Sequence, residues 1–265
     1  MYKRRLIPVL FLKDGWMVRS EGFVEHQFIG HPVSHVRRMV TWDVDELIVL
    51  NISKEESSFD TKRTDFKYEP VTSLLDFITL IAGECRIPLT FGGLIRSVED
   101  VRIRIQKGAD KIAINTLLFD NPKCVEEAAR SFGQQAIVAS IDYRMVEGEP
   151  IVFTERGKRN TKCNVVEWAR HAENSGAGEI LLNSIDKDGM ASGYDINIIE
   201  SVARSVCIPL VACGGAGVYG HFLKGFENTS SSALAAGNIF HFKENAYPNA
   251  KRFLKSKIED IRFNT

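Results

Sequence analysis

Residues 45–56 read DELIVLNISKEE and residues 178–189 read GEILLNSIDKDG, and the two stretches resemble each other. Each has an acidic residue, an apolar strand and a polar turn with a lysine. A second pair of similar segments follows in the same order, FGGLIR at 91–96 and CGGAGV at 213–218. The copies lie roughly half the chain apart, well beyond the periods of about 20–50 residues that small stacked repeats have. The sequence therefore predicts two copies of one large unit.

Working outward from these copies, short apolar runs alternate with amphipathic segments along the whole chain. The predicted strands are Arg5–Leu10, Glu46–Ile52, Ile87–Phe91, Lys111–Asn115, Ala136–Ile141, Glu179–Ser184, Ile208–Ala212 and Ser232–Ala236. Most are continuously apolar, as strands buried in a parallel sheet are. The predicted helices include Val71–Gly83, Val98–Lys107, Pro122–Phe132, Val165–Ser175, Ile196–Val206 and about Pro248–Ile261.

Eight strand–helix units predict an α/β fold of the (β/α)8 TIM-barrel type, with a two-fold half-barrel duplication. We expect a single domain over residues 1–265, with half-barrels at about 1–132 and 133–265. A doubly wound open sheet is the structural alternative. Two long segments, Leu12–Ile29 and Ser53–Glu69, follow the first and second strands. They are expected as loops on the catalytic face, where such loops act as lids or binding elements.

Composition excludes several classes of protein. The chain has 34 basic and 34 acidic residues, and this zero net charge argues against nucleic acid or an anionic membrane as the main partner. No apolar stretch approaches the ~20 residues that span a bilayer, and the apolar run near the start is too short for a signal peptide. The five scattered cysteines favour a reducing cytoplasm. We expect no metal site and no cofactor, and we place His31 and His35 on the surface.

Glycine-rich turns follow the strands in both halves at the catalytic face. The first, here called the first cup, consists of Gly92 and Gly93 before a capped helix start, with Asn115 and Thr116 at the next strand end. The second cup repeats this plan with Gly214 and Gly215, followed by Ala236, Gly237 and Asn238 after the last strand. Glycine turns and helix N-termini present backbone N–H groups to anions. The two cups predict an elongated substrate with a phosphate at each end.

These residues bring the chain close to a known family. It resembles the cyclase (synthase) subunit of imidazole glycerol phosphate synthase, a duplicated (β/α)8 barrel, and within it a divergent paralogue of the surface-polysaccharide type. The resemblance covers nearly the whole chain. The matching segments include Ile7–Gly15, Pro88–Asp100, Gly108–Thr116 and the specific motif GAGEILLNSIDKDGMASGYD at 176–195. It implies that Ser184, Asp188 and Gly189 also belong to the substrate site.

The resemblance also implies a partner. In the family, a separate glutaminase subunit docks at the bottom of the barrel, and its ammonia enters through a ring of charged residues. The matching residues are Arg5, Glu46, Lys111 and Glu179, all at the beginnings of strands. Four charges at one end of a barrel must be paired to be tolerated there. A purely stabilising ion cluster would also need this pairing.

The family's chemistry implies two aspartates at opposite sides of the barrel mouth, acting as general acid and base. The second is present as Asp142, but the first position holds Phe11, which cannot transfer a proton. Leu94 replaces a usual glycine of the first cup, and Asn51 a usual aspartate. The conduit for ammonia is therefore retained, while the cyclisation site is altered.

Three functions remain open at this point. The first is a paralogue that passes ammonia toward amidination of a surface-polysaccharide sugar, together with a sugar amidotransferase. The second is the histidine-pathway cyclase, which forms imidazole glycerol phosphate despite Phe11. The third is a non-catalytic barrel that activates a glutaminase. A phosphorylated small molecule is the expected substrate of the first two.

Overall fold

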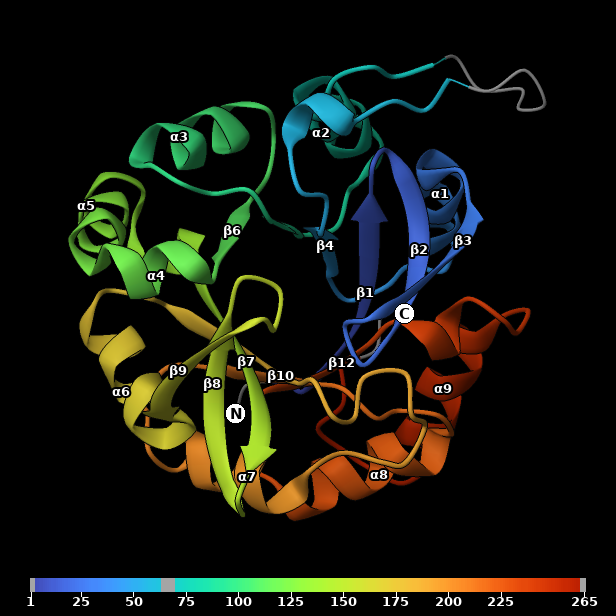
Figure 1. Cartoon of the computed structure of the whole chain (residues 1–265). Helices are drawn as coiled ribbons and strands as arrows, with labels where there is room; N and C mark the ends of the chain where they lie inside the picture. Colours follow the sequence, from blue (N-terminus) through green and yellow to red (C-terminus); the bar gives the residue numbers. More distant parts are fainter. Residues whose placement is uncertain (1–2, 63–69, 263–265) are drawn as a thin grey trace.

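The computed structural model describes residues 3–62 and 70–262. Within them, parallel strands form a closed barrel, which Figure 1 shows from one end, with helices around it. The barrel strands are β1 (Arg5–Lys13), β4 (Leu47–Asn51), β5 (Leu89–Gly92), β6 (Lys111–Ile114), β7 (Ile137–Val146), β10 (Glu179–Ser184), β11 (Leu210–Cys213) and β12 (Ala233–Ala236). Parallel pairing of β12 with β1 closes the ring, with Arg5 opposite Ala233. The predicted barrel is confirmed, and the open sheet is excluded.

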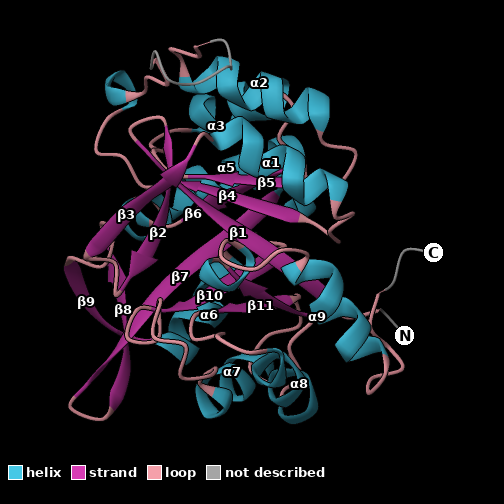
Figure 2. Ribbon diagram, turned by 90° about the vertical axis from the view of Figure 1, so that its right-hand side faces the viewer, coloured by secondary structure: helices cyan, strands magenta, loops and turns pink. Residues whose placement is uncertain are grey.

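Helices cover the outside of the barrel, as Figure 2 shows from the side. They are α1 (Pro32–Thr41), α2 (Leu74–Glu84), α3 (Val98–Gln106), α4 (Thr116–Asp120), α5 (Pro122–Phe132), α6 (Val165–Asn174), α7 (Ile196–Ala203), α8 (Tyr219–Asn228) and α9 (Ala246–Lys255), with 3₁₀ turns η1 (Glu56–Ser58), η2 (Gln134–Ala136) and η3 (Asn238–Phe240). The predicted extension of the last helix to Ile261 is wrong. Ile261 instead forms a parallel bridge with Arg4, which takes the chain out of the helix.

Two antiparallel hairpins extend the barrel at its mouth. β2 (Trp16–Glu21) and β3 (Glu25–Gly30) follow β1, so the predicted loop Leu12–Ile29 is a hairpin. β8 (Glu149–Thr154) and β9 (Arg159–Asn164) follow β7, which sequence reasoning did not predict. Each hairpin follows the first strand of one predicted half-barrel, and this placement supports the proposed duplication. Residues 63–69 of the predicted loop Ser53–Glu69 lie outside the described residues.

Alternation along the strands divides the core into two regions. Successive strand side chains point to opposite faces, so every second residue of β1 points into the barrel, from Arg5 at its base to Phe11 at its mouth. The interior is lined by apolar side chains: Ile7, Val9, Phe11, Val18, Ile48, Ala113, Val138, Leu181, Val211, Cys213, Ala233 and Ala235. The larger outer region lies between the barrel and the helices. A charged base, an apolar column and a polar mouth therefore follow one another along the axis.

The prediction that His31 and His35 lie on the surface is wrong, because the β2–β3 hairpin and the segment after η3 pack over them. His31 is 1% exposed and His35 8%. The ring of Trp16 meets His31 edge-on, and the ring of His241 lies 5.2 Å from that of His35. Burial lowers the pKa of His35 to about 4 and that of His241 to about 3, so both rings are neutral at pH 7.

A buried ion pair fastens α9 to the base of the barrel. Lys251 Nζ lies 2.7 Å from Asp45 Oδ2, and this oxygen also accepts the backbone N–H of Leu6. Both side chains are almost fully enclosed. Removing one partner of such a pair leaves an uncompensated buried charge, at a cost of about 3–5 kcal/mol.

Lys251→Met is therefore expected to lower the free energy of unfolding in urea by about 3–5 kcal/mol. The double variant Asp45→Asn/Lys251→Met carries no unpaired charge and should regain a large part of this loss. A double variant that is no more stable than Lys251→Met would contradict the explanation.

Candidate functional site

The four charged residues predicted at the strand starts form a continuous ring at the base of the barrel, here called the base ring. Arg5 Nη1 lies 2.6 Å from Glu46 Oε1, and Nη2 lies 2.8 Å from Glu179 Oε1. Lys111 Nζ bridges the same two carboxylates, at 3.2 Å from Glu46 and 2.7 Å from Glu179. Each charge thus has two opposite neighbours, and the four ion pairs form a closed circuit at the base of the barrel.

The base ring keeps its charges because its members compensate one another. Burial disfavours the charge of Arg5, but Glu179 and Glu46 outweigh it and hold the pKa of the guanidinium above its ordinary value. Burial likewise disfavours the charge of Glu46, but Arg5 and Lys111 lower the pKa of this carboxyl group. Loss of any one member would leave a buried net charge.

An open cavity of about 1220 Å³ lies at the strand starts, and three members of the base ring line it. Other lining residues come from both chain ends and from the loops that precede the strands, among them Lys3, Gly178, Pro209, Ser232 and Arg262. The base ring therefore separates this cavity from the apolar interior of the barrel.

Asp142 lies at the opposite end of the interior, in β7 at the point where this strand begins to pair with β8. Asn115 Nδ2 donates to Asp142 Oδ2 at 3.0 Å and to the carbonyl of Ser140 at 2.9 Å. Burial raises the pKa of Asp142 to about 7; a hydrogen bond from Asn183 opposes this shift, and the charge of Asp188 adds to it. A carboxyl group with this pKa can both accept and donate a proton at neutral pH.

Phe11 occupies the matching strand end on β1. It is 5% exposed and belongs to the apolar lining of the interior. A methyl group added at Gly237 would lie 3.4 Å from its ring, so the ring rests against the second cup. The mouth thus presents a carboxyl group on one side and a phenyl ring on the other.

The β2–β3 hairpin is fastened over the mouth by predicted site residues. Ser20 Oγ donates to Asp188 Oδ2 at 2.6 Å, and the backbone N–H of Phe23 reaches the same oxygen at 3.3 Å. Asn238 Nδ2 donates to the carbonyl of Ser20 at 2.9 Å. A side chain at Gly189 would collide with this carbonyl, which explains a glycine there. Asp188, Gly189 and Asn238 are thus brought together around one hairpin.

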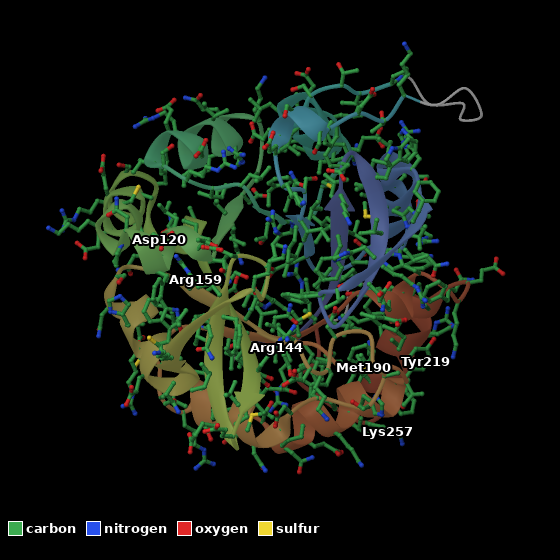
Figure 3. The ribbon with its side chains drawn as sticks, viewed as in Figure 1. Asp120, Arg144, Arg159, Met190, Tyr219 and Lys257 are labelled. Carbon is green, nitrogen blue, oxygen red and sulfur yellow. The ribbon has the colours of Figure 1, made fainter. Side chains whose placement is uncertain are left out.

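The β8–β9 hairpin reaches across to the first half of the chain. The backbone N–H of Glu155 at its turn donates to Thr116 Oγ1 at 3.2 Å, and Arg156 Nη1 donates to the carbonyl of Ser53 at 2.9 Å. Arg144 Nη2 donates to the carbonyl of Gly22 in the other hairpin at 3.3 Å, and Figure 3 labels Arg144 near the middle of the mouth.

The glycines of both cups are packed tightly on neighbouring backbone. Gly93 has φ of 98°, and a side chain there would lie 1.9 Å from the carbonyl oxygen of Asn51. Gly215 has φ of 102°, and a side chain there would lie 2.2 Å from the carbonyl oxygen of Gly193. Only glycine meets both demands. The remaining predicted site residues at these strand ends, Gly92, Ser184, Gly214, Ala236 and Gly237, surround the same mouth.

Comparisons with known proteins identify the family of the chain. The family model described as "Histidine biosynthesis protein" matches residues 5–246. The chain belongs to this family. It is 39% identical, over 99% of its own length and all of the relative, to the protein named imidazole glycerol phosphate synthase subunit HisF from Hydrogenobaculum sp. (strain Y04AAS1). Proteins of the same name from Geobacillus kaustophilus and Chlorobaculum parvum are each 38% identical over 99% of the chain and their full length.

The family is therefore that of a synthase subunit, as the sequence motifs predicted. Two sets of mouth residues were not predicted from sequence: Ser20 in the β2–β3 hairpin, and Arg144 with Arg156 around the β8–β9 hairpin. Their roles come from contacts between hairpins that are distant in sequence, and no local pattern marks them. In the described residues, no helix is long and apolar enough to cross a membrane.

The raised pKa of Asp142 predicts a pH-dependent stability. Between its ordinary pKa of 3.8 and about 7, the folded chain holds a proton at Asp142 that the unfolded chain releases. Folding stability is therefore lost as the pH rises through this window. The side chain introduced by Asp142→Asn cannot ionise. The free energy of unfolding of this variant in urea, minus that of the unchanged protein, should therefore increase from pH 5 to pH 8. Asp76→Asn, on an exposed turn of α2, is the control; a pH-independent difference for Asp142→Asn would contradict the pKa.

Proposed function

We propose that the chain is the ammonia-using synthase subunit of a glutamine amidotransferase complex. The observation that carries this proposal is the order of features along the barrel axis. A charged ring backed by an open cavity lies at the base, a column of apolar side chains lines the interior, and a carboxyl group with a pKa of about 7 lies at the mouth. A glutaminase subunit at the cavity would supply ammonia, which would cross the interior to the mouth.

In this proposal each region has a separate task. Ammonia is neutral and small, so an apolar column can pass it while a charged ring controls its entry. Asp142 would act on the bound substrate as general acid and base, since its pKa lies close to the operating pH. The two hairpins would hold the mouth covered and exclude water from the reaction. The five cysteines are all free, which fits a cytoplasmic setting.

Two acceptors for the ammonia have separate support. The full-length similarity to proteins named as imidazole glycerol phosphate synthase subunits favours the histidine intermediate, with imidazole glycerol phosphate as the product. Phe11 favours a changed acceptor, because a phenyl ring leaves the mouth with one proton-transferring group where a ring closure of this family would use two. The candidate for a changed acceptor is a surface-polysaccharide sugar, which would be amidinated with a sugar amidotransferase as a further partner. The comparisons favour the histidine intermediate as the acceptor. Phe11 at the mouth favours the surface-polysaccharide sugar instead.

The test is an assay of the purified chain with an ammonium salt and each acceptor in turn. Formation of imidazole glycerol phosphate at an ordinary enzymatic rate would establish the first acceptor. If none forms, Phe11→Asp is the informative variant, because a gain of cyclase activity would show that Phe11 alone blocks the reaction. A chain that stimulates a glutaminase but consumes no ammonia with either acceptor would overturn the proposal in favour of a non-catalytic barrel.

A further inference from the structure

Asn183 is the last inward-facing residue of β10, the strand that links the base ring to the mouth. Successive side chains of a strand point to opposite faces, so Glu179 of the base ring, Leu181 of the apolar interior and Asn183 all face the barrel axis. Asn183 pairs with Asp142 of β7 on one side and with Cys213 of β11 on the other. It therefore lies where the apolar column ends and the polar mouth begins.

The two ends of the Asn183 amide are used differently. The residue is 3% exposed, and its side-chain nitrogen donates to the carboxyl group of Asp142. This donation fixes the orientation of the amide, because the reverse orientation would place the amide oxygen against a carboxyl oxygen. The amide oxygen Oδ1 is buried and accepts no hydrogen bond from any protein group within residues 3–62 and 70–262.

An unpaired acceptor at this depth is unusual, because most buried polar atoms have a partner and an exception calls for a specific explanation. The second amide beside Asp142 shows the usual pattern. Asn115 donates its nitrogen to Asp142 and to the carbonyl of Ser140, and its oxygen accepts the hydroxyl of Thr116 at 3.4 Å. Of the two amides that brace Asp142, only Asn183 thus keeps an oxygen for a ligand.

This oxygen suits ammonia better than it suits a charged ligand. Ammonia has three N–H donors, and the apolar side chains of the interior offer it no acceptor. The first acceptors at the upper end of the column are Asp142 and the oxygen of Asn183. An amide oxygen is neutral, so it can hold an N–H bond without favouring the ammonium ion, which has no lone pair for attack on an acceptor.

We propose that Asn183 Oδ1 binds ammonia as it leaves the interior of the barrel and holds it beside Asp142. The inference rests on the proposed function and deepens it, since it names the atom that receives the ammonia. It makes Asn183 an ammonia-binding residue. Asn115, by contrast, is a positioning residue that acts through Asp142.

A matched pair of variants tests the proposal on the full-length chain. Asn183→Leu and Asn115→Leu each remove an amide that donates to Asp142, but only the first removes the unpaired oxygen. With saturating acceptor, Asn183→Leu is expected to raise the KM for ammonium at least about fivefold, as the loss of one hydrogen bond does. Asn115→Leu is expected to lower kcat and to change this KM less than about twofold. Asn183→Thr offers a hydroxyl oxygen as acceptor and should recover part of the affinity.

Steady-state kinetics in which ammonium and acceptor are varied separately give the answer. An equal rise of the ammonium KM in both leucine variants would overturn the proposal, because Asn183 would then be only a brace for Asp142. A rise of the acceptor KM in place of the ammonium KM would also overturn it, because the oxygen would then bind the acceptor. Leucine has nearly the shape of asparagine, so both variants should fold, and urea unfolding checks this.

A binding experiment that needs no acceptor separates this inference from the proposed function. The side-chain amide signal of Asn183 is identified in ¹H–¹⁵N spectra by its absence from Asn183→Leu. In the unchanged chain it should shift on addition of ammonium chloride, more at pH 8 than at pH 6, and should not shift with sodium chloride. No shift would overturn this inference, whereas a shift without consumption of ammonia with either acceptor would overturn only the proposed function.

Discussion

Replacing Asp142 with asparagine is expected to lower the turnover number of the ammonia-dependent reaction by about 10²–10⁴-fold, the usual contribution of a positioned acid–base group. Asparagine has nearly the same shape, and its amide oxygen can still accept the hydrogen bond that Asn115 donates at 3.0 Å. The substitution therefore removes proton transfer with little change in packing. Steady-state kinetics at several pH values are the measurement.

The accompanying pH profile distinguishes a chemical role from a structural one. With Asp142 present, activity should change with an apparent pKa near 7, and this inflection should be missing from the residual activity of the variant. Asp76→Asn is the control for the same chemical change at an exposed site. A variant that retains more than about a tenth of the activity would contradict a catalytic role for Asp142.

The second large effect is expected at the base ring. Glu179→Gln leaves Arg5 and Lys111 facing only Glu46, which is a net buried positive charge. Breaking a buried ionic network in this way costs about 3–5 kcal/mol of stability. We also expect the variant, in the presence of a glutaminase partner, to release ammonia to solvent instead of passing it to the mouth.

A double variant separates these two consequences. Lys111→Met/Glu179→Gln removes one charge of each sign, so it should recover stability in urea unfolding while the ring remains incomplete. If the base ring controls ammonia, this variant should still hydrolyse glutamine with the partner but form less product per glutamine than the unchanged chain. Recovery of both stability and product yield would show that the base ring is only a stabilising ion cluster.

The sequence predicts the barrel well because its strands are short, apolar and buried on both faces. The pattern also places Arg5 and Glu46 at the base, since a charge beside an apolar run marks a strand end. Contacts between distant segments are harder to predict. His31 and His35 are buried by a hairpin that packs over them, and their own neighbours in sequence give no sign of it.

The same limit applies to the mouth. Phe11 and Asp142 are found at its two sides because each directly follows a strand predicted from the sequence, Arg5–Leu10 and Ala136–Ile141. Arg104, a buried residue of α3 that forms an ion pair with Glu56, is in the sequence only one of several charged residues along a helix. Its burial and its contact with the carbonyl of Leu94 depend on how α3 packs under the loop after β5. The pattern of apolar residues along the helix does not predict this packing.

Each hairpin at the mouth pairs with a strand of its own half of the chain and is also held by contacts from the opposite half. The β2–β3 hairpin, in residues 1–132, binds Asp188, Asn238 and Arg144, while the β8–β9 hairpin, in residues 133–265, binds Thr116 and Ser53. Either half expressed alone would therefore keep the strand pairing of its hairpin but lose these contacts from the other half. These contacts tie the two halves of the chain to each other, so a substitution at Asp188 or Thr116 is expected to loosen a hairpin that lies in the other half.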